Sequence, residues 1–229
     1  MYVAVDENDA NQFDEPESVE ECPLSIDASV LQTIRCAAHD VQLSVSDVFK
    51  DQNLQKQLTK VRDLVKILRK LPYVSHFREK GRKKPFLDND TRWGSKYRMV
   101  ECIGSQMDHI RSLLSDELNE RFDDEFWNFV SDFIESVKPV FILTKRIQEQ
   151  NLTCGDFYLY WYECVLHLTE LKTPLADQLV IALDQRKHMW FKNKAFLAAL
   201  YVDVRLNCFN PPILSQDEKE VAMVSINLD

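Results

Sequence analysis

The stretch of this chain best suited to chemistry is Leu87 to Glu101, in which Arg92 precedes Trp93. A guanidinium group beside an indole suits a nucleic acid, because the first can contact phosphate and the second can stack on a base. Tryptophan is usually highly buried, so the alternative is a helix start whose Trp93 packs into a core. The local sequence favours this packing interpretation, and the rest of the chain has to decide between the two.

The residues on either side of this stretch carry opposite charges in separate blocks. Lys56 to Arg98 holds fourteen Lys and Arg residues and four acids, whereas Met1 to Asp27 holds nine acids and no Lys or Arg. The net charge of -9 comes from the acidic block, since 28 acids and 28 bases remain elsewhere. Such blocks predict an acidic leader and a basic surface that could meet a polyanion, or two solvated faces that partly neutralise each other.

A basic surface of this kind would bind phosphates with an affinity that depends on salt. An exposed aromatic ring would add base stacking, worth about 1 to 3 kcal/mol. We therefore predict a DNA-contacting surface made from the basic helix 53–73, the basic loop, the Arg-Trp pair and the residues just after it; its predicted site residues lie in the loop and around the pair. These site residues are Arg82, Lys83, Lys84, Arg92, Trp93, Lys96, Tyr97 and Arg98.

Metal binding and catalysis have weaker support in the sequence. Cys36 and His39 have a spacing that a metal accepts, but a structural zinc normally needs four ligands, and no second His/Cys pair has matching spacing. A role for His39 at a strand end, capping or contacting phosphate, is favoured. The chain has no glycine-rich phosphate loop, no GxSxG and no HExxH. We therefore predict no catalytic residue, no metal site and no cofactor.

The elements that must position these residues are predicted to be mainly helices. Four Gly and eight Pro in 229 residues favour long helices over a turn-rich β architecture. Apolar residues recur at helical spacing through most of the chain, and a single short strand is expected near 31–37. Pro139 is expected to kink or split its helix, because it removes a backbone donor. The expected helices span 40–49, 53–73, 92–114, 123–150, 157–171, 175–190, 194–202 and 215–229.

The cysteines and the apolar runs indicate in which cellular compartment the protein is expected. The six cysteines form no CxxC pair, the N-terminus lacks the features of a signal peptide, and no run of eighteen apolar residues occurs. We expect a soluble, reduced, intracellular protein that does not contact a membrane.

Three separated parts of the chain resemble hAT-superfamily DNA transposases and the zinc-finger BED-domain proteins derived from them. Ile34 to Val45, IRCAAHDVQLSV, is similar to the C-x-x-H-x-x-x-L segment of that family. Leu87 to Glu101, LDNDTRWGSKYRMVE, is close to its D-x-x-T-R-W-x-S-x-Y-x-M motif. Leu152 to Trp161, taken with Ala198 to Asn207, is similar to the segment usually read A-x-x-L-D-P-R.

The resemblance implies a mainly α fold in which an all-helical insertion domain covers 41–229. Residues 29–40 would be the last strand of an RNase H-like α/β core, and 1–28 would be a disordered acidic leader. Trp93 would inherit contact with a flipped DNA base, and His39 would inherit a place near the active site and the DNA. Val204 departs from the pattern, because it stands where proline is usual.

The catalytic carboxylates of the family lie upstream of the C-x-x-H segment and beyond the insertion, which implies that they fall outside this chain. Asp6 and Asp9 stay open as degenerate stand-ins, and an intact member would use Mg²⁺ or Mn²⁺. We expect a nuclear, catalytically inactive fragment of a hAT-type transposase that binds DNA weakly and in a salt-dependent way. The alternative is a protein-interaction module that pairs with itself or with a full-length transposase-like protein.

Overall fold

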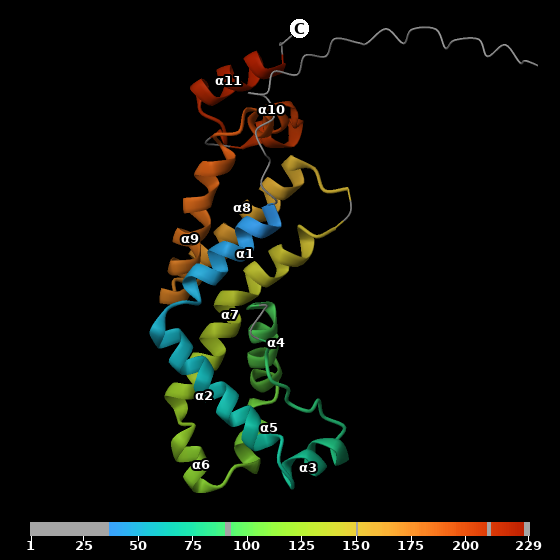
Figure 1. The fold of residues 1–229 in the computed structure, drawn as a ribbon, viewed down its shortest axis with the longest axis vertical. Helices are drawn as coiled ribbons and strands as arrows, with labels where there is room; N and C mark the ends of the chain where they lie inside the picture. The colour runs from blue at the N-terminus through green and yellow to red at the C-terminus, as the bar shows by residue number, and fades with distance from the viewer. Residues whose placement is uncertain (1–36, 90–92, 150, 210–211, 227–229) are drawn as a thin grey trace, which may run out of the picture. The chain divides into compact units, whose positions relative to one another are not determined.

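The computed structural model describes residues 37–89, 93–149, 151–209 and 212–226, without the side chains of Ala37, Asn207 and Cys208. All of them belong to the second of two compact units, Thr33–Asp229. Within the described ranges the chain forms eleven α-helices, one 3₁₀ helix and no strand, which confirms the mainly α fold class (Figure 1). None of these helices combines the length and the apolar character of a membrane span.

Most of the helices are joined by short connections, whereas the segment from α3 to α4, residues 80–92, is longer. Their bounds are α1 Ala37–Val48, α2 Gln52–Leu68, α3 Tyr73–Glu79, α4 Trp93–Gly104, α5 Met107–Leu113, α6 Asp116–Arg121, α7 Asp124–Arg146, α8 Cys154–Leu171, α9 Pro174–Trp190, α10 Lys194–Val202, the 3₁₀ helix η1 Val204–Cys208 and α11 Gln216–Ile226.

At the N-terminal end of the described part, the expected helix 40–49 is present as α1, which begins three residues earlier than predicted. The expected leader over 1–28 and nearly all of the expected strand near 31–37 lie outside the described residues. Ala37 is the first residue of α1, so helix rather than strand begins there. The expected boundary between core and insertion at 40–41 falls inside this helix.

Two of the expected helices are each divided into two separate helices in the structure. The expected helix 53–73 is α2 followed by α3, because α2 ends at Leu68 and Pro72 precedes the first residue of α3. The expected helix 92–114 is α4 followed by α5, with a break after Gly104. Glycine and proline are poor residues for a helix interior, which explains both positions.

Of the kink or split expected at Pro139, the split does not occur, because α7 continues through this residue as one helix. The neighbouring Phe133, Val137 and Val140 are fully buried. Packing of this apolar face offsets the one backbone hydrogen bond that the proline removes, because most helix stability in proteins comes from tertiary packing.

Helix α7 is the element around which the others pack. It contacts α1, α4, α8 and α9, while α1 lies along α9 and α10 packs against α8 and α11 (Figure 1). The buried residues of these helices form one continuous apolar core. The motif around Trp93 therefore enters the fold where α4 meets α7.

Candidate nucleic-acid interface

The segment that leads into α4 is fixed by the carboxylate of Asp88. Arg62 of α2 donates to it from Nε at 2.9 Å and from Nη2 at 2.7 Å, and the Lys96 ammonium lies 3.9 Å away. Burial alone would raise the pKa of Asp88, but the hydrogen bonds from Arg62 and the charges of both cations outweigh it and lower that pKa. Asp88 thus stays ionised, and two cations of the basic region are engaged inside the fold.

The two aromatic residues predicted to contact DNA lie in the core. Trp93 is 8% exposed and meets Phe49 and Phe141 edge-on, at ring-centroid distances of 6.3 and 6.2 Å. Tyr97 is 1% exposed, stacks on Phe141 at 4.4 Å and donates its hydroxyl to Glu101 at 2.9 Å. Burial and Glu101 raise the pKa of the Tyr97 hydroxyl. In this conformation neither ring offers a face to a base, as the packing interpretation describes.

The remaining motif residues also hold the local backbone. Ser95 Oγ accepts the Asn89 amide at 2.8 Å and donates to the Asn89 carbonyl at 2.7 Å. Lys96 is buried beside Asp88, whereas Arg98 is exposed on α4. Arg92 lies outside the described residues. Of the motif side chains predicted to bind DNA, the structure therefore presents Arg98 to solvent.

The basic loop between α3 and α4 is ordered by contacts to its backbone. The Arg82 amide donates to the Phe77 carbonyl at 2.8 Å, and Gln106 Nε2 donates to the Lys83 carbonyl at 3.0 Å. Gln106 is buried and also donates to the Cys102 carbonyl at 3.0 Å. Sequence reasoning missed Gln106, because an isolated glutamine at a helix break carries no pattern of its own.

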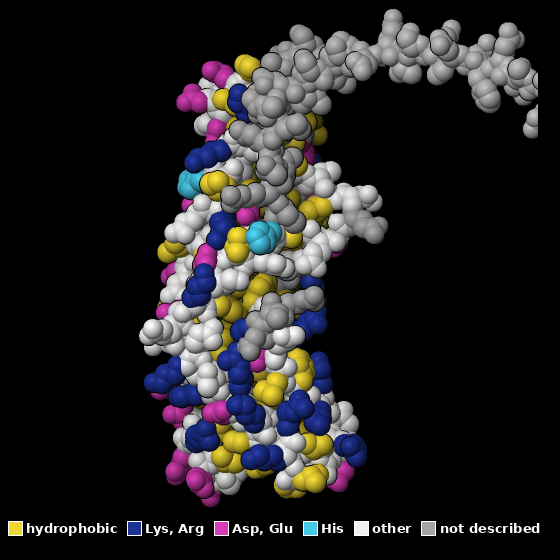
Figure 2. Space-filling view, viewed as in Figure 1, with side chains coloured by type: hydrophobic (Ala, Val, Ile, Leu, Met, Phe, Trp, Pro, Cys, Tyr) yellow, Lys and Arg dark blue, Asp and Glu magenta, His cyan; other side chains and the backbone are white. Residues whose placement is uncertain are grey.

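This loop belongs to a broad basic surface on α2, α3 and the segment that follows them. Figure 2 shows Lys and Arg side chains gathered over this part of the molecule. Burial lowers the pKa of His109, and the nearby charges of Arg82, His76 and Lys80 lower it further, which reports a positive local potential. The exposed cations of the region are Lys56, Lys66, Arg69, Lys70, Arg78, Lys80, Arg82, Lys83, Lys84 and Arg98.

His39 is exposed in the first turn of α1, a helix that packs against α7 and α9. The basic loop follows α3, which packs against α2. Among the described residues, no hydrogen bond or ion pair joins His39 to the loop. The structure therefore brings Arg82, Lys83 and Lys84 together but does not add His39 to them.

Residues of the third family-like segment link α8 to η1 through hydrogen-bonded ion pairs. Arg205 donates to Asp203 from Nε at 2.9 Å and from Nη2 at 2.6 Å, and to Asp156 from Nη1 at 2.6 Å. Hydrogen bonds from Thr153 and then from Arg205 lower the pKa of Asp156 to about 2. A Cβ atom at Gly155 would lie 1.8 Å from Asp203 Oδ2, so the close approach requires glycine. These residues hold the fold together.

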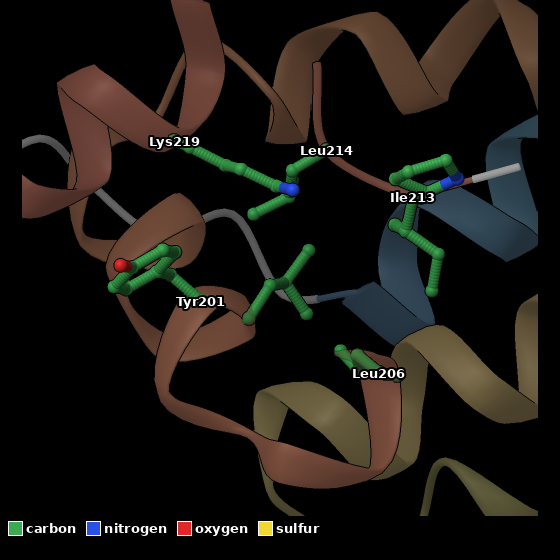
Figure 3. Close-up of a pocket in the computed structure, with 7 residues that line it drawn as sticks. Tyr201, Leu206, Ile213, Leu214 and Lys219 are labelled. Atoms are coloured by element: carbon green, nitrogen blue, oxygen red, sulfur yellow. The ribbon is translucent and has the colours of Figure 1, made fainter. Parts of the chain in front are cut away.

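The described part of the chain has a small pocket near its C-terminal end and a wider, more open hollow beside α1 and α9. A pocket of about 70 Å³ beside α10, η1 and α11 is lined by Tyr201, Leu206, Ile213, Leu214 and Lys219, among others (Figure 3). This pocket is smaller than the sites for cofactors and drug-sized ligands, which usually measure about 300 to 1,000 Å³. The other hollow measures about 300 Å³, is open to solvent and is lined by Val48, Ile181 and Ala182, among others. Within the described ranges, no three His, Cys, Asp or Glu side chains are grouped so that they could hold a metal ion.

The cysteines in the described part have no features of an activated nucleophile. Cys102, Cys154 and Cys164 are free thiols, and burial raises the pKa of each, in Cys164 to about 12. A reactive cysteine instead has a lowered pKa, because the thiolate is the nucleophile.

The described part of the chain is an all-helical unit with a basic surface, and Trp93 of the Arg-Trp motif is packed in its core. Residues 34–135, from the residues just before α1 into α7, match the family model of the ZBED1 RNase-like helical domain. The match confirms the resemblance over this part of the chain, which is similar to a transposase-derived, ZBED1-like helical domain. No curated protein and no solved structure matches it.

Proposed function

We propose that this transposase-derived chain binds DNA in the nucleus through the basic surface of α2, α3 and the loop Arg82–Lys84, and that it cuts no DNA. The observation that supports this most directly is that the loop exposes three adjacent cations while Phe77 and Gln106 hold its backbone. A preordered loop loses little conformational freedom on binding, so more of the electrostatic attraction remains as affinity.

The binding rests on phosphate contacts. Each cation that neutralises a phosphate releases counterions, and the logarithm of the affinity falls by about 0.9 per contact for each tenfold rise in salt. Phosphate contacts position a protein on DNA without reading its sequence. Binding is therefore weak, salt-dependent and nearly indifferent to sequence.

Trp93 and Tyr97 contribute to this function from inside the fold. Both pack against Phe141 and so hold α4 on α7 beside the basic surface. Arg92 joins Arg98 as a further phosphate contact in this proposal.

The test compares two triple variants with equal changes of charge. Changing Arg82, Lys83 and Lys84 to Gln removes the loop cations, while changing the exposed Lys172, Lys192 and Lys194 to Gln removes three charges elsewhere. Fluorescence anisotropy with a labelled duplex at 50 mM salt is expected to show at least tenfold weaker binding for the loop variant. Equal loss in both variants, or no binding by the unchanged chain, would contradict the proposal.

Catalytic inactivity is tested separately on hairpin and duplex DNA. The chain is incubated with each substrate in the presence of Mg²⁺ or Mn²⁺, and no nicks are expected on a sequencing gel. Metal-dependent nicking that survives purification would show that the chain is an active nuclease.

A protein-interaction module remains the second candidate, because apolar side chains are exposed near the C-terminal end of the described part. Val202 is 61%, Val204 74% and Val224 65% exposed. Size-exclusion chromatography with light scattering separates the candidates: a stable dimer in the absence of DNA would favour the interaction module, and a monomer would favour DNA binding.

A further inference from the structure

Two exposed cations from different helices each lie over the aromatic ring of Phe141 on α7. Arg98 of α4 places its Cζ 5.6 Å from the centre of the ring, and Lys145 of α7 places its Nζ 4.6 Å from it. Arg98 belongs to the basic region of the sequence, whereas Phe141 and Lys145 lie more than forty residues beyond it. The fold alone joins them.

The ring of Phe141 is held firmly by α4. Tyr97 stacks on it at 4.4 Å with an interplanar angle of 30°, and Trp93 meets it edge-on at 83°. It also lies against the first turn of α4, since a Cβ atom added at Gly94 would lie 3.5 Å from it. Phe141 therefore gives both cations a fixed aromatic surface to pack against.

Neither cation is neutralised by an acid in the described part of the chain, where no carboxylate lies within 4.0 Å of Arg98 or Lys145. Glu101, the acid of α4, accepts the hydroxyl of Tyr97. The neighbouring Arg146 differs, because it donates to Glu163. Lys145 thus keeps its full charge for an external anion, whereas the residue beside it does not.

We propose that Arg98, Phe141 and Lys145 form a clamp for one backbone phosphate of DNA, which extends the proposed DNA-binding surface from α4 onto α7. The proposal rests on the proposed function, in which Arg98 already takes part, and it adds Phe141 and Lys145, which lie beyond both the motif and the family match. Guanidinium groups bind phosphate through paired N–H donors, and an ammonium group binds it as a point charge. The ring restricts the rotamers of both side chains, so less entropy is lost when they meet the phosphate.

Phe141 acts here as a positioning residue rather than as a surface for base stacking. Tyr97 and the two cations already occupy the space around its ring. The clamp therefore shows no preference among bases.

The experiment measures DNA affinity against salt for Arg98→Gln, Lys145→Gln and the control Lys194→Gln. Each clamp variant is expected to bind several-fold more weakly at about 0.1 M salt, with the control unchanged. Because both cations serve one phosphate, the salt slope is expected to fall by at most about 0.9 in either variant. Circular dichroism melts confirm that the variants fold. Inorganic phosphate is added at matched ionic strength: competition no stronger than that of chloride supports a site for the DNA backbone, and strong competition overturns it in favour of a free-phosphate site.

A double-mutant cycle tests the ring. If Phe141 positions Lys145, the loss caused by Lys145→Gln shrinks at least twofold in a Phe141→Leu background, whereas independent effects would overturn the role of the ring. Unchanged affinity in both cation variants, with weaker binding by the loop variant, would overturn the clamp alone. Unchanged affinity in all of them would overturn the clamp and the DNA-binding surface together.

Discussion

Arg62 and Asp88 form a two-pronged ion pair, with Nε 2.9 Å from Oδ1 and Nη2 2.7 Å from Oδ2. Their side chains are 19% and 3% exposed, so the pair is largely shielded from water. Asp88 is the first acid of the family motif, and Arg62 is a cation of the basic helix α2. The pair therefore shows that part of the motif and part of the charge serve the fold rather than a ligand.

Breaking this pair is expected to destabilise the protein. Asp88→Asn removes the buried carboxylate that Arg62 and Lys96 share, and we expect a loss of about 2 to 3 kcal/mol in the free energy of unfolding measured with urea at pH 7. Asp63→Asn, which breaks exposed pairs to Lys66 and Arg121, is the control with an expected loss below about 1 kcal/mol. Equal losses in both variants would show that the buried pair stabilises the fold no more than the exposed pairs do.

Replacing Trp93 separates packing from base stacking. Trp93→Ala removes a core side chain and is expected to cost about 3 to 5 kcal/mol of stability. Trp93→Phe keeps an aromatic ring, so DNA affinity is expected to stay within twofold of the unchanged chain. A tenfold loss of affinity in Trp93→Phe, at unchanged melting temperature, would mean that the indole itself contacts DNA.

Whether a cation of the basic block is exposed or paired depends on residues that are distant in the chain. In the sequence, Arg62, Lys66 and Lys96 are equivalent members of a basic block, yet Lys66 is exposed while the other two converge on Asp88. Their difference depends on a carboxylate up to 26 residues away in the chain. Charge can therefore be predicted locally, but the partner of each charge cannot.

Helix ends show the same division between local and distant causes. The bounds of α10 were predicted at Lys194–Val202, and those of α9 within one residue, because Thr173 and Asn193 cap these helices locally. The breaks after Leu68 and Gly104 were missed, since the apolar spacing continues across both. The packing that keeps α7 whole at Pro139 is likewise invisible to local rules.

Gly155→Ala is expected to destabilise the link between α8 and η1. Alanine favours helix by about 1 kcal/mol over glycine, but its Cβ would lie 1.8 Å from Asp203 Oδ2, so Asp203 must leave Arg205. We expect a net loss of about 1 to 3 kcal/mol in thermal unfolding. In an Asp203→Ala background the same change should be neutral or stabilising, and a persistent loss there would place the strain elsewhere.

His109 is expected to titrate below its usual range. A lowered pKa in the folded state means that the unfolded chain binds more protons, so this histidine reduces stability as pH falls through about 6.5. DNA phosphates beside Arg82 and Lys80 would weaken the positive potential and raise the pKa of His109. NMR titration of the ring with and without DNA measures both effects; a pKa at or above 6.5 that DNA leaves unchanged would contradict them.

Gln106 is expected to affect DNA affinity by ordering the backbone of the basic loop, although its side chain is uncharged. Gln106→Leu removes the hydrogen bond to the Lys83 carbonyl, so hydrogen exchange at 82–84 should accelerate and DNA affinity should fall a few-fold. The salt slope should stay the same, because no cation is lost. A lower slope would show that the change disturbs the phosphate contacts themselves.

The most direct test of DNA binding by this surface is the slope of log affinity against log salt, measured by anisotropy between 50 and 200 mM salt. For the variant in which Arg82, Lys83 and Lys84 are changed to Gln, the slope is expected to be smaller by up to about 2.7 than for the unchanged chain. Identical slopes for the two proteins, with both folded, would contradict the account.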